Sequence, residues 1–107
     1  MTAYLIDEHS SDQYTVTEPV CKIGSNPNNN VVLQFEDVEP NHVRIELKNG
    51  VYFCALEPGA RAKKKYMFLF DIATAKHNNV PLVGRGIKMA DGDKLQVGSR
   101  ILNFRNV

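Results

Sequence analysis

Short segments rich in β-branched, aromatic and other apolar residues follow one another along the chain, and Gly, Pro, Asn and Asp separate them. Alternation of apolar and polar positions in such segments is typical of strands that bury one face. Strands are predicted at residues 3–7, 14–17, 20–24, 31–35, 42–56 (as a hairpin), 94–97 and 101–104. Many short strands with frequent turns indicate an all-β fold, either a β-sandwich or a barrel.

The hairpin at 42–56 is the clearest element, and Asn49 and Gly50 lie at its centre. Asn-Gly favours a type I′ turn, in which both central residues have positive φ. One face of the hairpin would then be wholly apolar, whereas the other, which carries Arg44 and Glu46, would be half-solvated. A two-residue loop pairs the facing apolar residues as Leu47 with Tyr52, Ile45 with Cys54, and Val43 with Leu56.

The C-terminal part repeats this organisation. A turn around Gly92 precedes the strand at 94–97, and Gly98 marks a tight reversal before the closing strand. The best helix candidate is "DIATAK" at 71–76, which is no longer than about two turns.

The length and composition of the chain fit one domain, residues 1–107, since 43% hydrophobic and 23% charged residues are ordinary globular values. A formal net charge of +1 argues against nucleic acid or an anionic membrane as the partner. The longest strongly apolar run, at 66–70, is far too short to span a bilayer, and no signal peptide is recognisable. Cys21 and Cys54 lack a CxxC motif, so we expect buried free thiols in a reducing compartment rather than a disulfide or metal site.

Enzyme motifs are missing from the sequence. It contains no GxSxG, Walker A, HExxH or paired-carboxylate motif, and its histidines, His9, His42 and His77, are scattered. We therefore expect no catalysis, no metal and no cofactor. The simplest role for His42 is structural, as a side chain bonded to a nearby loop.

The segment at 57–79 joins the basic run "RAKKKY" to the apolar run "YMFLF". The basic residues are either a solvated loop or a contact for phosphate or nucleic acid. The apolar residues are either a core strand, with Met67 and Leu69 facing inward, or part of a surface that meets a partner. In the second case the partner surface would consist of Arg61, Lys64, Tyr66 and Phe68, or the strand would pair with a second copy to form a homodimer.

The order of these pieces resembles the forkhead-associated (FHA) domain: Ile-Gly, an Asn-rich loop, an apolar strand, a strand opened by His, an Asn-Gly hairpin, and "DGDKLQVGSRILNF". The resemblance covers 3–56 and 80–105. It implies a two-sheet antiparallel β-sandwich whose loops at one end bind phosphothreonine peptides, and it makes 57–79 an insertion or a rebuilt loop.

The residues that read phosphate in FHA domains differ here. Ser25 follows Gly24 where the family has an Arg that contacts phosphate, and Glu39 stands at the Ser of the Ser-x-x-His loop. His42 matches the His that braces that loop in the family. The Ser-x-Asn-Gly-Thr motif expected after 51–56 is absent from 57–79. The scaffold residues therefore match, and the phosphate-reading residues do not.

These observations predict a non-catalytic scaffold module that binds another protein without needing phosphate. The alternative is a phosphothreonine-peptide reader with a rebuilt basic site made of Arg44, Arg61 and the lysines at 63–65. The resemblance implies an intracellular protein, either nuclear or cytoskeletal and centrosomal. Candidate partner-binding residues are Ser25, Asn26, Glu39, Asn41, Arg44, Arg61, Lys63, Lys64, Tyr66 and Phe68. Candidate structural residues are Gly24, His42, Asn49, Gly50 and Gly92.

Overall fold

The computed structural model describes residues 2–58, 63–64, 71–72 and 75–106; for 63–64 and 71–72 it describes only the backbone. These residues form strands and turns, and no helix occurs among them. The strands are β1 (Ala3–Asp7), β2 (Gln13–Thr15), β3 (Val20–Gly24), β4 (Val31–Val32), β5 (Val43–Lys48), β6 (Val51–Leu56), β7 (Lys63–Lys64), β8 (Asp71–Ile72), β9 (Ala75–His77), β10 (Val80–Pro81), β11 (Ile87–Lys88), β12 (Lys94–Val97) and β13 (Arg100–Asn106).

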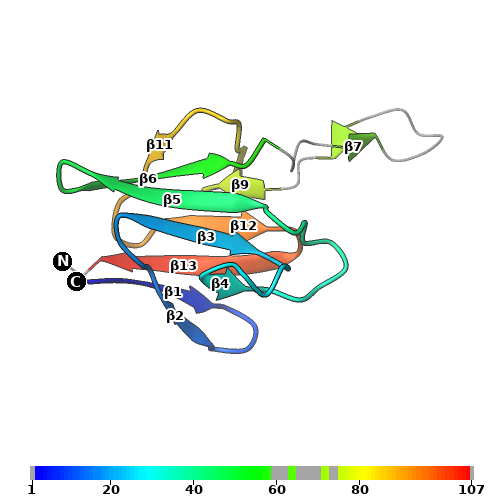
Figure 1. Cartoon of the computed structure of the whole chain (residues 1–107), viewed down its shortest axis with the longest axis horizontal. Coiled ribbons are helices and arrows are strands. Elements are labelled where there is room, and N and C mark those ends of the chain that lie inside the picture. Colours follow the sequence, from blue (N-terminus) through cyan, green and yellow to red (C-terminus); the bar gives the residue numbers. More distant parts are fainter. Residues whose placement is uncertain (1, 59–62, 65–70, 73–74, 107) are drawn as a thin grey trace.

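Two main sheets enclose the core (Figure 1). The six-stranded sheet has the order β10-β9-β12-β13-β1-β2, and the five-stranded sheet has the order β11-β6-β5-β3-β4. β7 and β8 form a separate two-stranded ribbon. The predicted two-sheet β-sandwich is confirmed. All strand pairs run antiparallel except β3 and β4, which run parallel at the edge of the five-stranded sheet.

The β5–β6 hairpin has the predicted register. Its turn consists of Asn49 and Gly50, whose φ angles are 51° and 77°, as a type I′ turn requires. The three apolar pairs face each other as expected, and their side chains, apart from the half-buried Leu47, are buried. Arg44 and Glu46 lie on the opposite face and are half-buried.

The core lies between the sheets and is built from alternate residues of the strands. In β1, for example, Leu5 is buried between half-buried neighbours. The rings of Tyr52 and Phe104, from opposite sheets, meet edge to face with centroids 5.4 Å apart. Cys21 and Cys54 are free and fully buried, as predicted, and burial raises the pKa of Cys54 to about 12.

One predicted element was wrong, and another was too long. The "DIATAK" segment is not a helix, because Asp71–Ile72 and Ala75–His77 are strands; β9 pairs with β12. The strand expected at 31–35 ends at Val32. The N–H of Phe35 donates to the carbonyl oxygen of Leu33 at 3.0 Å, which turns the chain away from the sheet.

Five connections gather at one end of the sandwich, on the right of Figure 1. They are residues 8–12, 25–30, 33–42, 57–58 and 98–99, which we call the loop end. The start of β1, the end of β13 and the Asn49-Gly50 turn lie at the opposite end. The positions that the FHA resemblance assigns to phosphate reading therefore lie together at the loop end.

Candidate functional site

Two loops of the loop end meet at Gly24. A Cβ atom at this position would lie 2.1 Å from the carbonyl oxygen of Pro40, so no larger residue fits without moving the backbone. The N–H of Ser25 donates to the Glu39 carbonyl oxygen at 2.9 Å, and the N–H of Asn26 donates to that of Pro40 at 3.3 Å. The structure thus brings Ser25 and Glu39, two of the sequence-predicted site residues, directly together.

The asparagines after Gly24 build the rest of this contact. The Asn29 side-chain amide donates to the Pro40 carbonyl oxygen at 2.6 Å and to the Asn26 carbonyl oxygen at 2.9 Å. The Asn26 side-chain oxygen accepts the N–H of Asn28 at 2.9 Å. Because Asn side chains can replace backbone partners in turns, the Asn-rich loop holds a fixed shape without regular structure. The sequence placed Asn26 among the partner-binding residues, whereas its side chain here serves its own loop.

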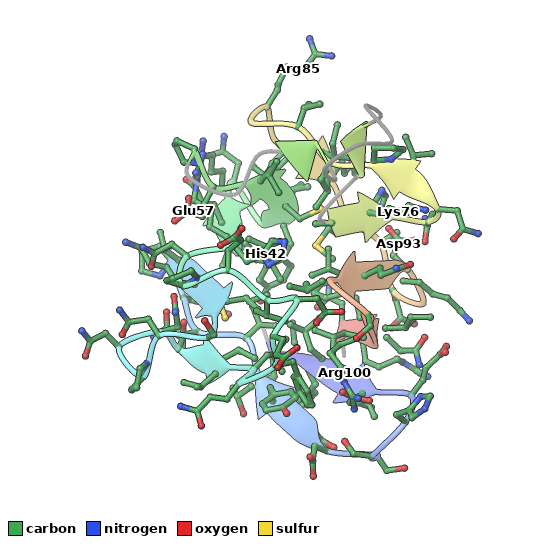
Figure 2. The ribbon with its side chains drawn as sticks, turned by 90° about the vertical axis from the view of Figure 1, so that its right-hand side faces the viewer. His42, Glu57, Lys76, Arg85, Asp93 and Arg100 are labelled. Carbon is green, nitrogen blue, oxygen red and sulfur yellow. The ribbon has the colours of Figure 1, made fainter. Side chains whose placement is uncertain are left out.

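His42 lies near the middle of the loop end, between the two sheets (Figure 2). Its side chain is fully buried, and Nδ1 accepts the N–H of Glu39 at 3.0 Å. Its own N–H donates to the Ile23 carbonyl oxygen at 2.9 Å, and its carbonyl oxygen accepts the N–H of Glu57 at 3.0 Å. One residue therefore connects β3, the 33–42 loop and the start of the segment after β6.

A pocket of about 370 Å³ opens beside His42. Its lining consists of Lys22, Glu39, Pro40, Asn41, Glu57 and Pro58. Two carboxylates and one ammonium group therefore stand around it. Lys22 and Asn41 are exposed, so the pocket is accessible from solvent.

Arg44 is held by two carboxylates beside this pocket. Its Nε lies 2.6 Å from Glu46 Oε1, and its Nη1 lies 2.6 Å from Glu57 Oε1. The hydrogen bonds to Glu46 and then to Glu57 raise the pKa of Arg44, and the same contact with Arg44 lowers the pKa of Glu46. The sequence left Arg44 open as a phosphate ligand; in the structure its Nε and Nη1 are already paired with carboxylates.

The other predicted residues separate into two groups. Arg61, Tyr66 and Phe68 lie outside the described residues, and Lys63 and Lys64 are described only by their backbone in β7. Asn49, Gly50 and Gly92 lie in turns at the opposite end of the sandwich, where Gly92 has a φ of 91°. These three residues therefore form turns and do not contribute to the site.

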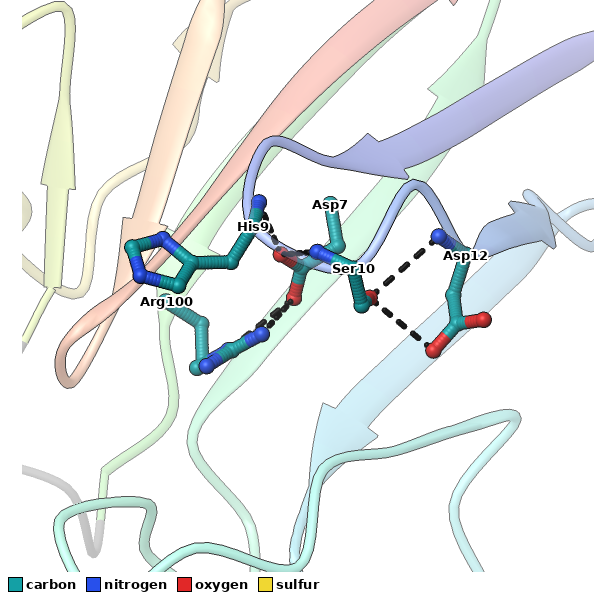
Figure 3. Close-up of polar contacts among 5 residues, drawn as sticks. All are labelled: Asp7, His9, Ser10, Asp12 and Arg100. Carbon is teal, nitrogen blue, oxygen red and sulfur yellow. Dashed lines mark hydrogen bonds and ion pairs between the residues drawn. The ribbon is translucent and has the colours of Figure 1, made fainter.

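An ion pair that no pattern in the sequence indicated also belongs to the loop end (Figure 3). Asp7, only 2% exposed, contacts Arg100 through Nη2 at 2.8 Å and Nε at 3.0 Å. Its other oxygen accepts the N–H groups of His9 at 2.7 Å and Ser10 at 3.2 Å. Burial alone would raise the pKa of Asp7, but the backbone N–H of His9 and the Arg100 guanidinium together hold that pKa below its ordinary value.

The Arg100 guanidinium also covers the ring of Phe35, with its central carbon 4.4 Å from the ring centroid. Phe35 is 42% exposed, although Leu33 and Val38 on either side of it are buried. The 33–42 loop is further fixed at Gly98, where a Cβ would lie 2.6 Å from the carbonyl oxygen of Asp37. Sequence analysis placed Phe35 at the end of a strand and did not include it among the candidate residues.

A second His–Asp contact lies at the opposite end of the sandwich. His77 Nε2 is 2.7 Å from Asp93 Oδ2, which also accepts the N–H of Ala90 at 2.8 Å. Across the part of the chain that the structure describes, no group of His, Cys, Asp and Glu side chains is placed to hold a metal ion. Nor does that part contain a helix long and apolar enough to cross a membrane.

Comparison with known proteins identifies the fold. No family model matches the sequence, and no curated protein does. The N-terminal FHA domain of S. cerevisiae Rad53p, solved with a phosphothreonine peptide, is similar with a TM-score of 0.78 at 12% identity, over 100% of this chain and 94% of that one. The FHA domain of the CT664 protein from Chlamydia trachomatis is similar with a TM-score of 0.76 at 10% identity, over 100% of this chain and 99% of that one.

A third FHA domain, that of FhaA in complex with the intracellular domain of Rv3910, gives a TM-score of 0.73 at 21% identity, over 98% of this chain and 100% of that one. These similarities extend over essentially the whole chain. The chain therefore has the FHA fold, as the sequence resemblance implied.

Proposed function

We propose that the chain is a non-catalytic protein-interaction module that binds its partner at the loop end without requiring a phosphate group. The observation that carries the proposal is the contact between Ser25 and Glu39. The two loops come together as an FHA phosphate site requires, yet one position offers a hydroxyl instead of a guanidinium and the other a carboxylate instead of a hydroxyl.

The electrostatic consequences disfavour a phosphate. A charge-assisted bond from Arg is worth about 1.5–3 kcal/mol, and the neutral hydroxyl of Ser25 cannot replace it fully. A phosphate about 5 Å from the Glu39 carboxylate would be repelled by roughly 3 kcal/mol at an effective dielectric constant near 20, before salt screening. Together these effects lower phosphopeptide affinity by several orders of magnitude.

Arg44 does not restore the lost charge. Glu46 holds its Nε and Glu57 holds its Nη1, each at 2.6 Å, so a phosphate that bound this guanidinium would lie close to two carboxylates. Glu57 also lines the pocket and adds a second anion there. This arrangement argues against Arg44 as a phosphate ligand of the rebuilt basic site.

The neighbouring structures support a protein as the partner. The Rad53p domain is bound to a phosphothreonine peptide, and the FhaA domain is bound to a domain of another protein. We infer that this chain likewise recognises a protein, inside the cell, where the buried thiols of Cys21 and Cys54 would stay reduced.

A degenerate library of phosphothreonine peptides, screened beside its unphosphorylated copy, tests the proposal. We expect no phosphothreonine peptide to bind with a dissociation constant below roughly 100 μM, about 5.5 kcal/mol of binding free energy. A low-micromolar hit that is lost after phosphatase treatment would overturn it in favour of a rebuilt phosphate site. Lys22, which lines the pocket, and the lysines at 63–65 would then be the residues to substitute next.

A further inference from the structure

Phe35 is presented to solvent by a loop that buries Leu33 before it and Val38 after it. Leu33 and Val38 are inserted into the core with 1% and 5% exposure, whereas Phe35 between them is 42% exposed. The N–H of Val38 donates to the Phe35 carbonyl oxygen at 3.0 Å and closes a turn that begins at Phe35 and has Glu36 and Asp37 at its centre. Core packing on both sides therefore fixes where the ring points.

The ring also rests on a rigid support. The Arg100 guanidinium lies 4.4 Å from its centroid, and Arg100 is itself held by Asp7, which is buried and bonded to two backbone N–H groups. A large aromatic side chain that is already ordered loses little conformational freedom when a partner covers it. Phe and Arg are also among the residue types enriched where proteins meet.

Acidic residues adjoin the platform that Phe35 and Arg100 form: Glu36 and Asp37 follow Phe35 in the chain, and the Asp12 carbonyl oxygen accepts the N–H of Asp7 at 2.9 Å. Asp12, Glu36 and Asp37 are exposed, and none of the three forms an ion pair with another described residue. Arg100, which supports the ring, is itself paired with Asp7. A partner that approaches Phe35 therefore meets a negative rim, which favours positive charge and repels phosphate, nucleic acid and anionic lipid.

We propose that Phe35 is the anchor of the partner site and that it takes an unphosphorylated segment with an apolar side chain flanked by Lys or Arg. The apolar side chain packs on the exposed face of the Phe35 ring, opposite Arg100. The flanking cations face Asp12, Glu36 and Asp37. This inference rests on the proposed function, because it assigns the partner chemistry of the same loop end.

Three immobilised peptide libraries of equal length test it on the full chain. The first fixes Lys or Arg on both sides of a Leu or Phe, the second replaces those cations with Asp or Glu, and the third carries phosphothreonine beside the same apolar residue. We expect selection from the first library only. Binding of the selected peptides should weaken with added salt, because exposed charges at the rim are screened.

Variants then locate the site by fluorescence polarisation with the selected peptides. Phe35→Ser should weaken binding at least about tenfold, as loss of a hot-spot residue does, whereas Phe35→Tyr should keep it within about threefold. Glu36→Lys should weaken binding several-fold. Asp91→Lys, the same charge change at an exposed position outside the loop end, is the matched control and should leave binding unchanged. Thermal melts verify that each variant folds.

Each remaining outcome overturns the inference in a recognisable way. Selection of basic peptides that bind Phe35→Ser as tightly as the parent chain would leave the proposed function standing and place its site elsewhere. Selection from the phosphothreonine library would overturn both the anchor and the phosphate-independent function. Selection from the acidic library, or from none of the three, would overturn the anchor and its basic partner alone.

Discussion

The backbone N–H of Ser25 lies 2.9 Å from the carbonyl oxygen of Glu39. Together with the bonds from Asn26 and Asn29 to the Pro40 carbonyl oxygen, this contact joins the two loops that would form a phosphate site in an FHA domain. Neither position has the side chain that reads phosphate there in the family. The loop geometry is kept while the chemistry at the contact has changed.

Introducing the Arg and the Ser that FHA domains have at positions 25 and 39 should therefore restore part of the phosphate affinity. The double variant Ser25→Arg with Glu39→Ser replaces a hydroxyl with a guanidinium and removes one anion. We expect phosphothreonine peptides to bind at least about tenfold more tightly, since one charge-assisted bond exceeds 1.4 kcal/mol. Fluorescence polarisation measures the gain, and the unphosphorylated peptide is the control. An unchanged affinity would show that the loops hold these positions too far apart for one phosphate.

Gly24→Ala should destabilise the protein by about 2–3 kcal/mol, since the added methyl group would overlap the Pro40 carbonyl oxygen and force the loops apart. Gly84 offers a matched control, because nothing lies within 4 Å of the Cβ that Ala would add there. Urea unfolding of both variants measures the difference. Equal stabilities would mean that the 33–42 loop moves aside at little cost.

Replacing His42 should loosen the loop end. His42→Ala removes the acceptor of the Glu39 N–H inside a fully buried position, and we expect a loss of about 1–3 kcal/mol. His9→Ala, at an exposed position, should change stability by less than about 0.5 kcal/mol. Chemical denaturation gives both values, and amide hydrogen exchange at residues 39–42 shows whether the loss is local. A stable His42→Ala would contradict the bracing role.

The Asp7–Arg100 pair should make stability depend on pH. The folded-state pKa of Asp7 lies below its ordinary value of 3.8, so its contribution is complete above that value and is lost as the pH falls through the lowered pKa. Asp7→Asn should cost about 3 kcal/mol at neutral pH, because it leaves the Arg100 charge uncompensated.

The difference between the parent chain and Asp7→Asn should shrink as the pH falls below about 3.8, which denaturation at several pH values will measure. Asp91→Asn breaks an exposed pair with Arg105 and should cost no more than about 1 kcal/mol at neutral pH. A constant difference for Asp7→Asn across this range would show that folding does not lower the pKa of Asp7.

The hypothesis for 57–79 concerns side chains outside the described residues. If Tyr66 and Phe68 form a partner surface or an open edge, the double variant with Ser at both positions should lose self-association while its melting temperature stays nearly unchanged. Sedimentation and thermal melts measure the two properties. Unfolding of the variant would place both side chains in the core, and a monomeric parent chain would exclude pairing between copies.

Local signals in the sequence predicted the parts of the fold that depend on neighbours in the chain. Asn49 and Gly50 specify their own turn, and the hairpin register follows from it. The helix at 71–76 failed because strand pairing overrode local propensity: Ala75 lies opposite Val97 of β12 in the six-stranded sheet. Such pairing has no signature within a short window of sequence.

The candidate site shows the same limit. Ser25, Glu39 and His42 were found because a family pattern marks their positions. The pair of Asp7 and Arg100 was missed, since its members are 93 residues apart and only the pairing of β1 with β13 brings them together. No periodicity in the sequence reports a contact of that kind.

The outermost strands of both main sheets are very short. β10, β11 and β4 have two residues each, β2 has three, and Pro81 removes one backbone donor from β10. An edge of this length offers a foreign chain few backbone hydrogen bonds to extend. The edges of the two main sheets are thus poor templates for the addition of strands from other chains, as occurs in fibres. The loop end can therefore carry an exposed aromatic residue without promoting aggregation through these edges.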